Sequence, residues 1–103
     1  MAPPGDAVEM INAAIAATFK VPIGELNAPT RRRASVALAR QSAMYLAHVA
    51  LGLNFTEVGR AFGRDRTTAA HACRRIEALI VEDALFRQEV DFLSQMLQRR
   101  PEI

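Results

Sequence analysis

Residues 55–75 read FTEVGRAFGRDRTTAAHACRR, which has the make-up of two helices joined by a tight turn. Gly59 is small enough to let the second helix cross the first at close range. Gly63, four residues later, can supply the positive φ that such a turn requires. Three apolar residues are placed to hold the two helices together: Val58, Ala69 and Ala72. The pattern predicts a helix-turn-helix over about residues 55–80.

The residues after the turn are polar and lie at the N-terminus of the second helix: Arg66, Thr67 and Thr68. These positions face the major groove when the second helix of such a motif docks on DNA. The free N–H groups at this helix end also favour a phosphate. Other angled pairs of helices share this spacing, so the spacing alone leaves a structural role open.

Charge is distributed unevenly along the chain, although the net charge of the 103 residues is only +2. Residues 31–75 hold nine Arg against two acidic residues, whereas residues 1–30 and 76–103 have net charges of −2 and −3. The chain has twelve Arg and one Lys, and Arg suits planar contacts with phosphate and guanine. A basic middle between acidic ends indicates a face directed at a polyanion. The alternative is an Arg-rich surface that faces only solvent.

Apolar residues recur at helical spacing along almost the whole chain, and no stretch alternates with the period of a strand. Helices are expected over about residues 6–19, 35–51, 55–62, 66–81 and 83–98. The expected fold class is an all-α bundle. Its length suits one DNA-binding domain over residues 1–103, with a basic connector over about residues 29–41.

The apolar stripes predict which side chains form the core. Met10 belongs to the stripe of the first helix, and Met44, Met96 and the aromatic residues fall on later stripes. Cys73 is expected as a small core residue. His71 and Cys73 point about 200° apart on a helix, so they do not form a metal site.

Several functional classes are excluded by composition. A single Cys rules out a disulfide framework, and no apolar run approaches the roughly 20 residues that span a bilayer. Ser35 and Ser42 have no base at a recognisable spacing, so we expect no enzyme. We also expect no cofactor, no metal, no nucleotide and no membrane partner, and a cytoplasmic, nucleoid-associated protein.

Two strings in the chain resemble a known family. Residues 63–77, GRDRTTAAHACRRIE, are similar to GRDHTTVLHACRKIE in the C-terminal DNA-binding domain of the bacterial replication initiator DnaA. Residues 39–47, ARQSAMYLA, resemble the long-helix motif of the same family, and the similarity extends over about residues 8–97. The resemblance implies an all-helical domain that recognises the DnaA box in double-stranded DNA.

The resemblance also implies roles for single residues. The major-groove reading positions would be Asp65, Arg66, Thr67 and Thr68, and Arg32 would enter the adjacent minor groove. The backbone-contacting positions would be Arg40, Gln41 and Arg64, joined by Arg31, Arg33 and Arg74 of the basic band. A minor-groove Arg reads groove width, Asp can accept from a cytosine amino group, and a Thr methyl can pack on thymine. For Asp65, a plain helix-capping role is an equal alternative.

The chain departs from the family at three places. Its turn has one glycine after Phe62 where the family usually has two, Arg66 replaces His, and His48 stands where many members carry Lys. DNA binding should survive these changes. Arg66 is the residue expected to alter the preferred DNA sequence, because its guanidinium can bind guanine through two hydrogen bonds.

The expected function is sequence-specific binding to double-stranded DNA at DnaA-box-like sites, which regulates replication initiation or transcription. The alternative is a protein-interaction module that modulates the replication initiator or its regulators and has only residual DNA affinity. The 103 residues contain no GxxxxGK[ST] phosphate loop. If Met1 is the true start, we expect a free-standing DNA reader that cannot assemble an ATP-dependent initiator oligomer.

Overall fold

The computed structural model describes residues 4–20 and 34–98, and these residues form five helices and no strand. The helices are α1 (Pro4–Phe19), α3 (Ala34–Val49), α4 (Phe55–Phe62), α5 (Arg66–Glu82) and α6 (Ala84–Gln98). The expected all-α class is confirmed, and each helix begins and ends within two residues of its predicted position. Within the described ranges, no helix has the length and apolar character that crossing a bilayer requires.

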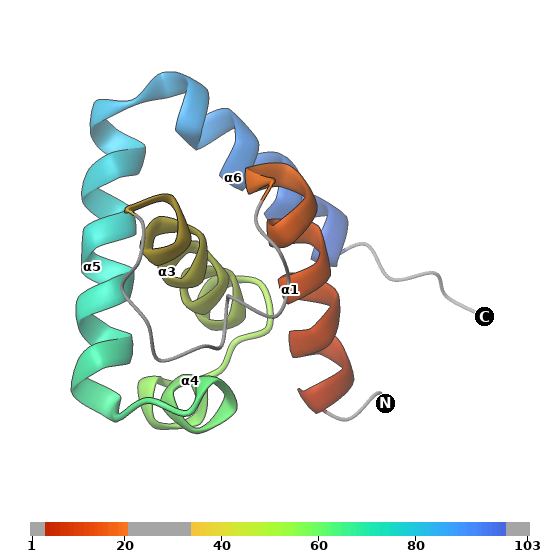
Figure 1. The fold of residues 1–103 in the computed structure, drawn as a ribbon, viewed down its shortest axis with the longest axis vertical. Helices are drawn as coiled ribbons and strands as arrows, with labels where there is room; N and C mark the ends of the chain where they lie inside the picture. The colour runs from red at the N-terminus through yellow and green to blue at the C-terminus, as the bar shows by residue number, and fades with distance from the viewer. Residues whose placement is uncertain (1–3, 21–33, 99–103) are drawn as a thin grey trace.

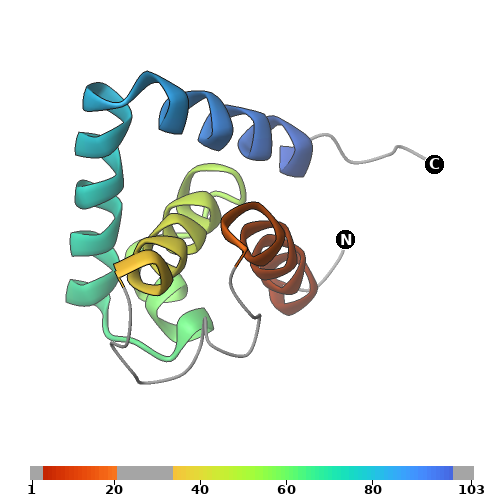
Figure 2. The ribbon, with the colours of Figure 1, turned by 45° about the horizontal axis from the view of Figure 1, so that its top comes forward.

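Helix α3 lies at the centre of the molecule and contacts α1, α4, α5 and α6 (Figure 1). Helix α5 runs along one side, with α4 at its N-terminal end and α6 at its C-terminal end. Figure 2 shows the same enclosure of α3 from a second direction. The two ends of α5 therefore adjoin different helices and belong to different parts of the molecular surface.

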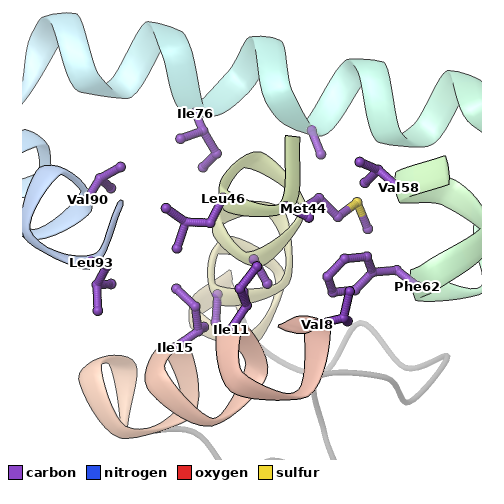
Figure 3. Close-up of a cluster of buried hydrophobic side chains, with 14 of the residues drawn as sticks. Val8, Ile11, Ile15, Met44, Leu46, Val58, Phe62, Ile76, Val90 and Leu93 are labelled. Carbon is purple, nitrogen blue, oxygen red and sulfur yellow. The ribbon is translucent and has the colours of Figure 1, made fainter. Parts of the chain in front are cut away.

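The core is formed by one apolar side of each helix around α3. Ile11 and Ile15 of α1, Leu46 of α3 and Ile76 of α5 are all fully buried and converge from different helices (Figure 3). Three alanines of α3 are also fully buried: Ala39, Ala43 and Ala47. Because alanine adds so little bulk, neighbouring helices can approach α3 closely.

The structure corrects three core predictions. Met10 is 60% exposed, because α1 turns Val8 rather than Met10 toward the core, on the same side as Ile11. Phe92 and Met96 are 64% and 48% exposed, respectively. Helix α6 has two apolar faces, and among the described residues the face that packs on the other helices is made by Phe86, Val90, Leu93 and Leu97. The predicted burial of Met44 and Cys73 is confirmed.

Candidate nucleic-acid interface

Helix α4 begins at Phe55 because Asn54 caps it. The Asn54 side-chain oxygen accepts from the Glu57 backbone N–H at 2.8 Å, and the Glu57 carboxylate accepts from the Asn54 N–H at 2.9 Å. This reciprocal pair satisfies two N–H groups that the helix itself leaves without partners. The start of the helix-turn-helix is therefore set by local sequence.

The turn between α4 and α5 depends on two glycines. Gly63 ends α4 in the left-handed region, with φ of 67°, where glycine is least strained. The Arg64 N–H donates to the Gly59 carbonyl at 2.8 Å, which folds the turn back onto α4. A Cβ on Gly59 would lie 2.7 Å from the Arg64 carbonyl oxygen and 2.9 Å from that of Asp65. The predicted roles of both glycines are thus explained by geometry.

Helix α5 begins with a cap from Asp65. Its carboxylate accepts from the Thr68 backbone N–H at 2.8 Å. Hydrogen bonds from the Thr68 backbone and side chain lower the pKa of Asp65 below its usual range, because they stabilise the charged form. The capping role of Asp65 is therefore present, while its base-reading role stays a prediction. Arg66, Thr67 and Thr68 are all exposed at this helix end.

A hollow of about 260 Å³ lies between α3, the turn and the first two turns of α5. It brings together five predicted DNA-contacting residues from distant parts of the chain: Arg40, Gln41, Arg64, Thr67 and Thr68. Four further described residues also line it: Ala37, Met44, His71 and Ala72. Side chains of α3 are therefore held beside the N-terminal end of α5.

The hollow is electropositive. Partial burial lowers the pKa of Arg40 because it removes water from the charged form, and the nearby positive charge of Arg64 lowers it further by repulsion. An anion placed between two guanidinium groups would offset this repulsion and form charge-assisted hydrogen bonds with both. Gln41 also lines the hollow, and the amide NH2 group of its side chain is a donor that an anion can accept from. The arrangement suits a phosphate group of a nucleic-acid backbone.

The remaining site residues extend the surface along α5. Thr67, His71 and Arg74 are exposed and, at spacings of four and three, they share one face of the helix. Sequence reasoning missed His71 because it considered the residue only beside Cys73. The spacing from Thr67 was the available indication. Arg31, Arg32 and Arg33 lie outside the described residues, so their roles stay predictions.

His48 has a structural role in the connection between α3 and α4. Its ring Nδ1–H donates to the Leu53 carbonyl at 2.7 Å, and its ring lies 4.6 Å from the ring of Phe55. A lysine, as in many family members, could not make this ring contact. His48 therefore stabilises the connection that leads into the helix-turn-helix.

The described residues hold no group of three or more His, Cys, Asp or Glu that could bind a metal ion. Burial, with a smaller effect of Glu77, raises the pKa of the Cys73 thiol to about 11. The thiol is therefore protonated at neutral pH and packs as a small apolar group.

Comparison with known proteins shows which family the chain belongs to. Residues 8–76 match the family described as "Bacterial dnaA protein helix-turn-helix". The chain belongs to this DnaA family. Over 92 residues it is 40% identical to the chromosomal replication initiator protein DnaA of Acinetobacter baylyi and 41% identical to that of Nitrobacter hamburgensis. These matches cover 88% of this chain but only 20% and 19% of the relatives, so the chain spans about a fifth of their length.

Two solved structures share the fold of this DnaA-family chain. A DNA replication initiation factor matches with a TM-score of 0.80 and 28% identity, over 92% of this chain and 29% of that one. A replication initiator DnaA bound to AMPPCP and single-stranded DNA matches with a TM-score of 0.77 and 29% identity, over 92% and 28%. The chain thus carries a DnaA-type helix-turn-helix, a DNA-binding and non-catalytic domain.

Proposed function

We propose that this chain binds double-stranded DNA at sites that resemble DnaA boxes, and that it regulates replication initiation or transcription there. Helix α5 lies in the major groove, where Arg66, Thr67 and Thr68 read bases and Asp65 both caps the helix and contacts a base. Arg32 enters the adjacent minor groove. The chain acts as one DNA-binding domain.

The observation that carries this proposal is the exposed N-terminal end of α5 beside an electropositive hollow. Helix N-termini attract phosphate through free N–H groups and the helix dipole. The hollow adds Arg40 from α3 and Arg64 from the turn. A phosphate bound in this hollow, beside the helix end, would hold α5 in register, while exposed Arg66 and Thr67 face the base edges.

Fluorescence anisotropy with the full chain tests the proposal. The ligands are a duplex with a DnaA box, a scrambled duplex and a single strand, each at two salt concentrations. The box duplex should bind at least about tenfold more tightly than the scramble, within the usual range for specific over non-specific binding. Equal affinity for both duplexes would contradict sequence-specific binding.

Two arginine variants separate the expected kinds of contact. Arg40→Ala should weaken all duplexes alike and reduce the salt slope by roughly one unit, as loss of one phosphate contact does. Arg32→Ala should weaken mostly the sites with an A·T-rich step beside the box, because a narrow minor groove concentrates negative potential. Exposed Arg87 of α6 provides the matched control, since Arg87→Ala should leave both properties unchanged. If Arg32→Ala behaves like Arg40→Ala, the minor-groove role is wrong.

The alternative function is a protein-interaction module that contacts the replication initiator or its regulators. The exposed apolar residues of α6 favour some protein contact. They lie away from α4 and the start of α5, so such a contact does not compete with DNA binding. The alternative would replace the proposal only if the box and scrambled duplexes bound equally.

A further inference from the structure

Helix α6 carries a second apolar face that nothing in the described structure covers. Leu85, Phe92 and Met96 are exposed, Leu85 to 73% of its surface and Phe92 to 64%. Their spacings of seven and four place them in one stripe along the helix. The buried face of α6 is made by other residues: Phe86, Val90, Leu93 and Leu97. Single exposed apolar residues are ordinary, but a stripe that includes a Phe is typical of an interaction surface.

An acidic residue lies within this stripe. Glu89 is four residues after Leu85 and three before Phe92, and it is exposed. Together with Gln88, these residues line a shallow hollow of about 400 Å³ on the surface of α6. Glu82 and Asp83 are exposed just before the helix begins. Residues 76–103 have a net charge of −3, so acidic residues outnumber basic ones in this part of the chain.

The position of Glu89 disfavours pairing with a second copy of the chain. If two α6 helices paired antiparallel with Leu85 opposite Met96, each Glu89 would lie opposite Phe92 of the other copy and close to the two-fold axis. In a parallel pair, the two Glu89 carboxylates would face each other. Either arrangement buries carboxylates without a cation, and that desolvation is costly. A different partner that brings a positive charge to Glu89 avoids this cost.

The stripe lies far from the proposed DNA surface. Helix α5 has 17 residues, so its two ends are about 25 Å apart at a rise of roughly 1.5 Å per residue. In Figure 2, α4 and the start of α5 are toward one end of the molecule, and α6 runs across the other. None of the stripe residues lines the electropositive hollow. A partner on α6 therefore leaves the DNA surface open.

We propose that the stripe of Leu85, Glu89, Phe92 and Met96 is a docking surface for an amphipathic helix of another protein. The apolar residues of that helix recur every three or four positions, and Lys or Arg beside them pairs with Glu89. This interaction goes beyond DNA binding, because it allows the chain to hold a protein and a duplex at the same time.

A synthetic amphipathic peptide with Leu at such spacings, flanked by Lys, probes this surface on the full chain by fluorescence anisotropy. Phe92→Ser and Glu89→Lys should each weaken peptide binding at least about fivefold. Met10→Ser is the matched control, since Met10 is an equally exposed apolar residue on α1, and it should leave binding unchanged. A peptide with Glu in place of Lys should bind Glu89→Lys more tightly than it binds the wild type.

Three outcomes would overturn the proposal. The first is that the Lys peptide does not bind or binds wild type and Phe92→Ser equally. The second is a concentration-dependent dimer in sedimentation equilibrium that Phe92→Ser abolishes, which would assign the stripe to a second copy. The third is a loss of box-duplex affinity in Phe92→Ser with its thermal unfolding unchanged, which would show that the two surfaces are not separate.

Discussion

Arg66 stands where the similar DnaA string GRDHTTVLHACRKIE has His. It is the first residue of α5, and its side chain is exposed. A guanidinium at this position can donate two hydrogen bonds to guanine, worth about 1–3 kcal/mol of discrimination. The shorter His of the family cannot make this fork. We therefore predict that the chain reads a variant box with G·C at the base pair that faces Arg66.

Selection of bound duplexes from a randomised pool checks this prediction, with wild type and Arg66→His side by side. The variant should shift the selected sequence toward the standard box, while its thermal stability stays nearly the same because the side chain is exposed. The alternative is that the one-glycine turn directs Arg66 to a phosphate. Identical consensus sequences for both proteins would favour that alternative and contradict base reading.

Gly59 and Gly63 are required for different physical reasons, and substitution separates them. Gly59→Ala places a Cβ against two backbone carbonyl oxygens, so the turn must shift, at a cost of about 1–3 kcal/mol. Gly63→Ala meets open space and is strained only by its positive φ, at a cost of about 1 kcal/mol. Urea denaturation should show the larger loss for Gly59→Ala, together with weaker duplex binding. Equal losses would mean that the turn moves aside freely.

At the scale of the elements, the caps decide where the helices of the motif begin. Asn54 and Asp65 each bind the N–H group three residues ahead, so α4 and α5 start at the next residue. Such caps are encoded within four consecutive residues. For this reason, the boundaries of α4 and the start of α5 were predicted correctly from sequence.

The cap of α5 predicts a dependence of stability on pH. Hydrogen bonds lower the pKa of Asp65 from its ordinary value of 3.8, so the folded state binds this proton less readily than the unfolded state does. The stabilising effect is therefore fully present above the unfolded pKa, and it is lost as the pH falls through the folded pKa. Asp65→Asn keeps a capping oxygen that does not titrate.

Thermal unfolding between pH 2.5 and about pH 6 tests this effect in wild type and Asp65→Asn. The difference between the two melting temperatures should be constant above about pH 5 and should change in favour of Asp65→Asn below pH 3.8. A difference that stays constant over the whole range would show that the carboxylate does not titrate with folding.

At the scale of the whole molecule, stability depends on the contacts around α3. Leu46 is fully buried where α1, α5 and α6 meet α3. Leu46→Ala leaves a cavity between these helices and should reduce the free energy of unfolding by about 2–5 kcal/mol. Met10→Ala is the control and should change it by less than about 0.5 kcal/mol, because Met10 is exposed. Urea denaturation measures both, and similar values would contradict the central position of Leu46.

Most residues of the candidate site were predicted from sequence, but their arrangement in space was not. Thr67 and Thr68 were selected from their place after the turn, and Arg40, Gln41 and Arg64 from the resemblance to a family. Their meeting in one hollow follows from the packing of α3 against α5. His71 was recognised as part of the site only because this packing places it in the lining of the hollow.

The sequence by itself determined the all-α class, the helix boundaries and the turn, because caps, glycines and apolar periodicity act within a few residues. It also determined the family, through the string at residues 63–77. Only the tertiary structure decided which apolar stripes are buried. Val8 rather than Met10 faces the core, and Phe92 and Met96 remain exposed, because burial depends on which neighbouring helices cover a given face. That choice is made by packing between distant segments, and the packing that buries the core leaves one apolar face of α6 uncovered by the described residues.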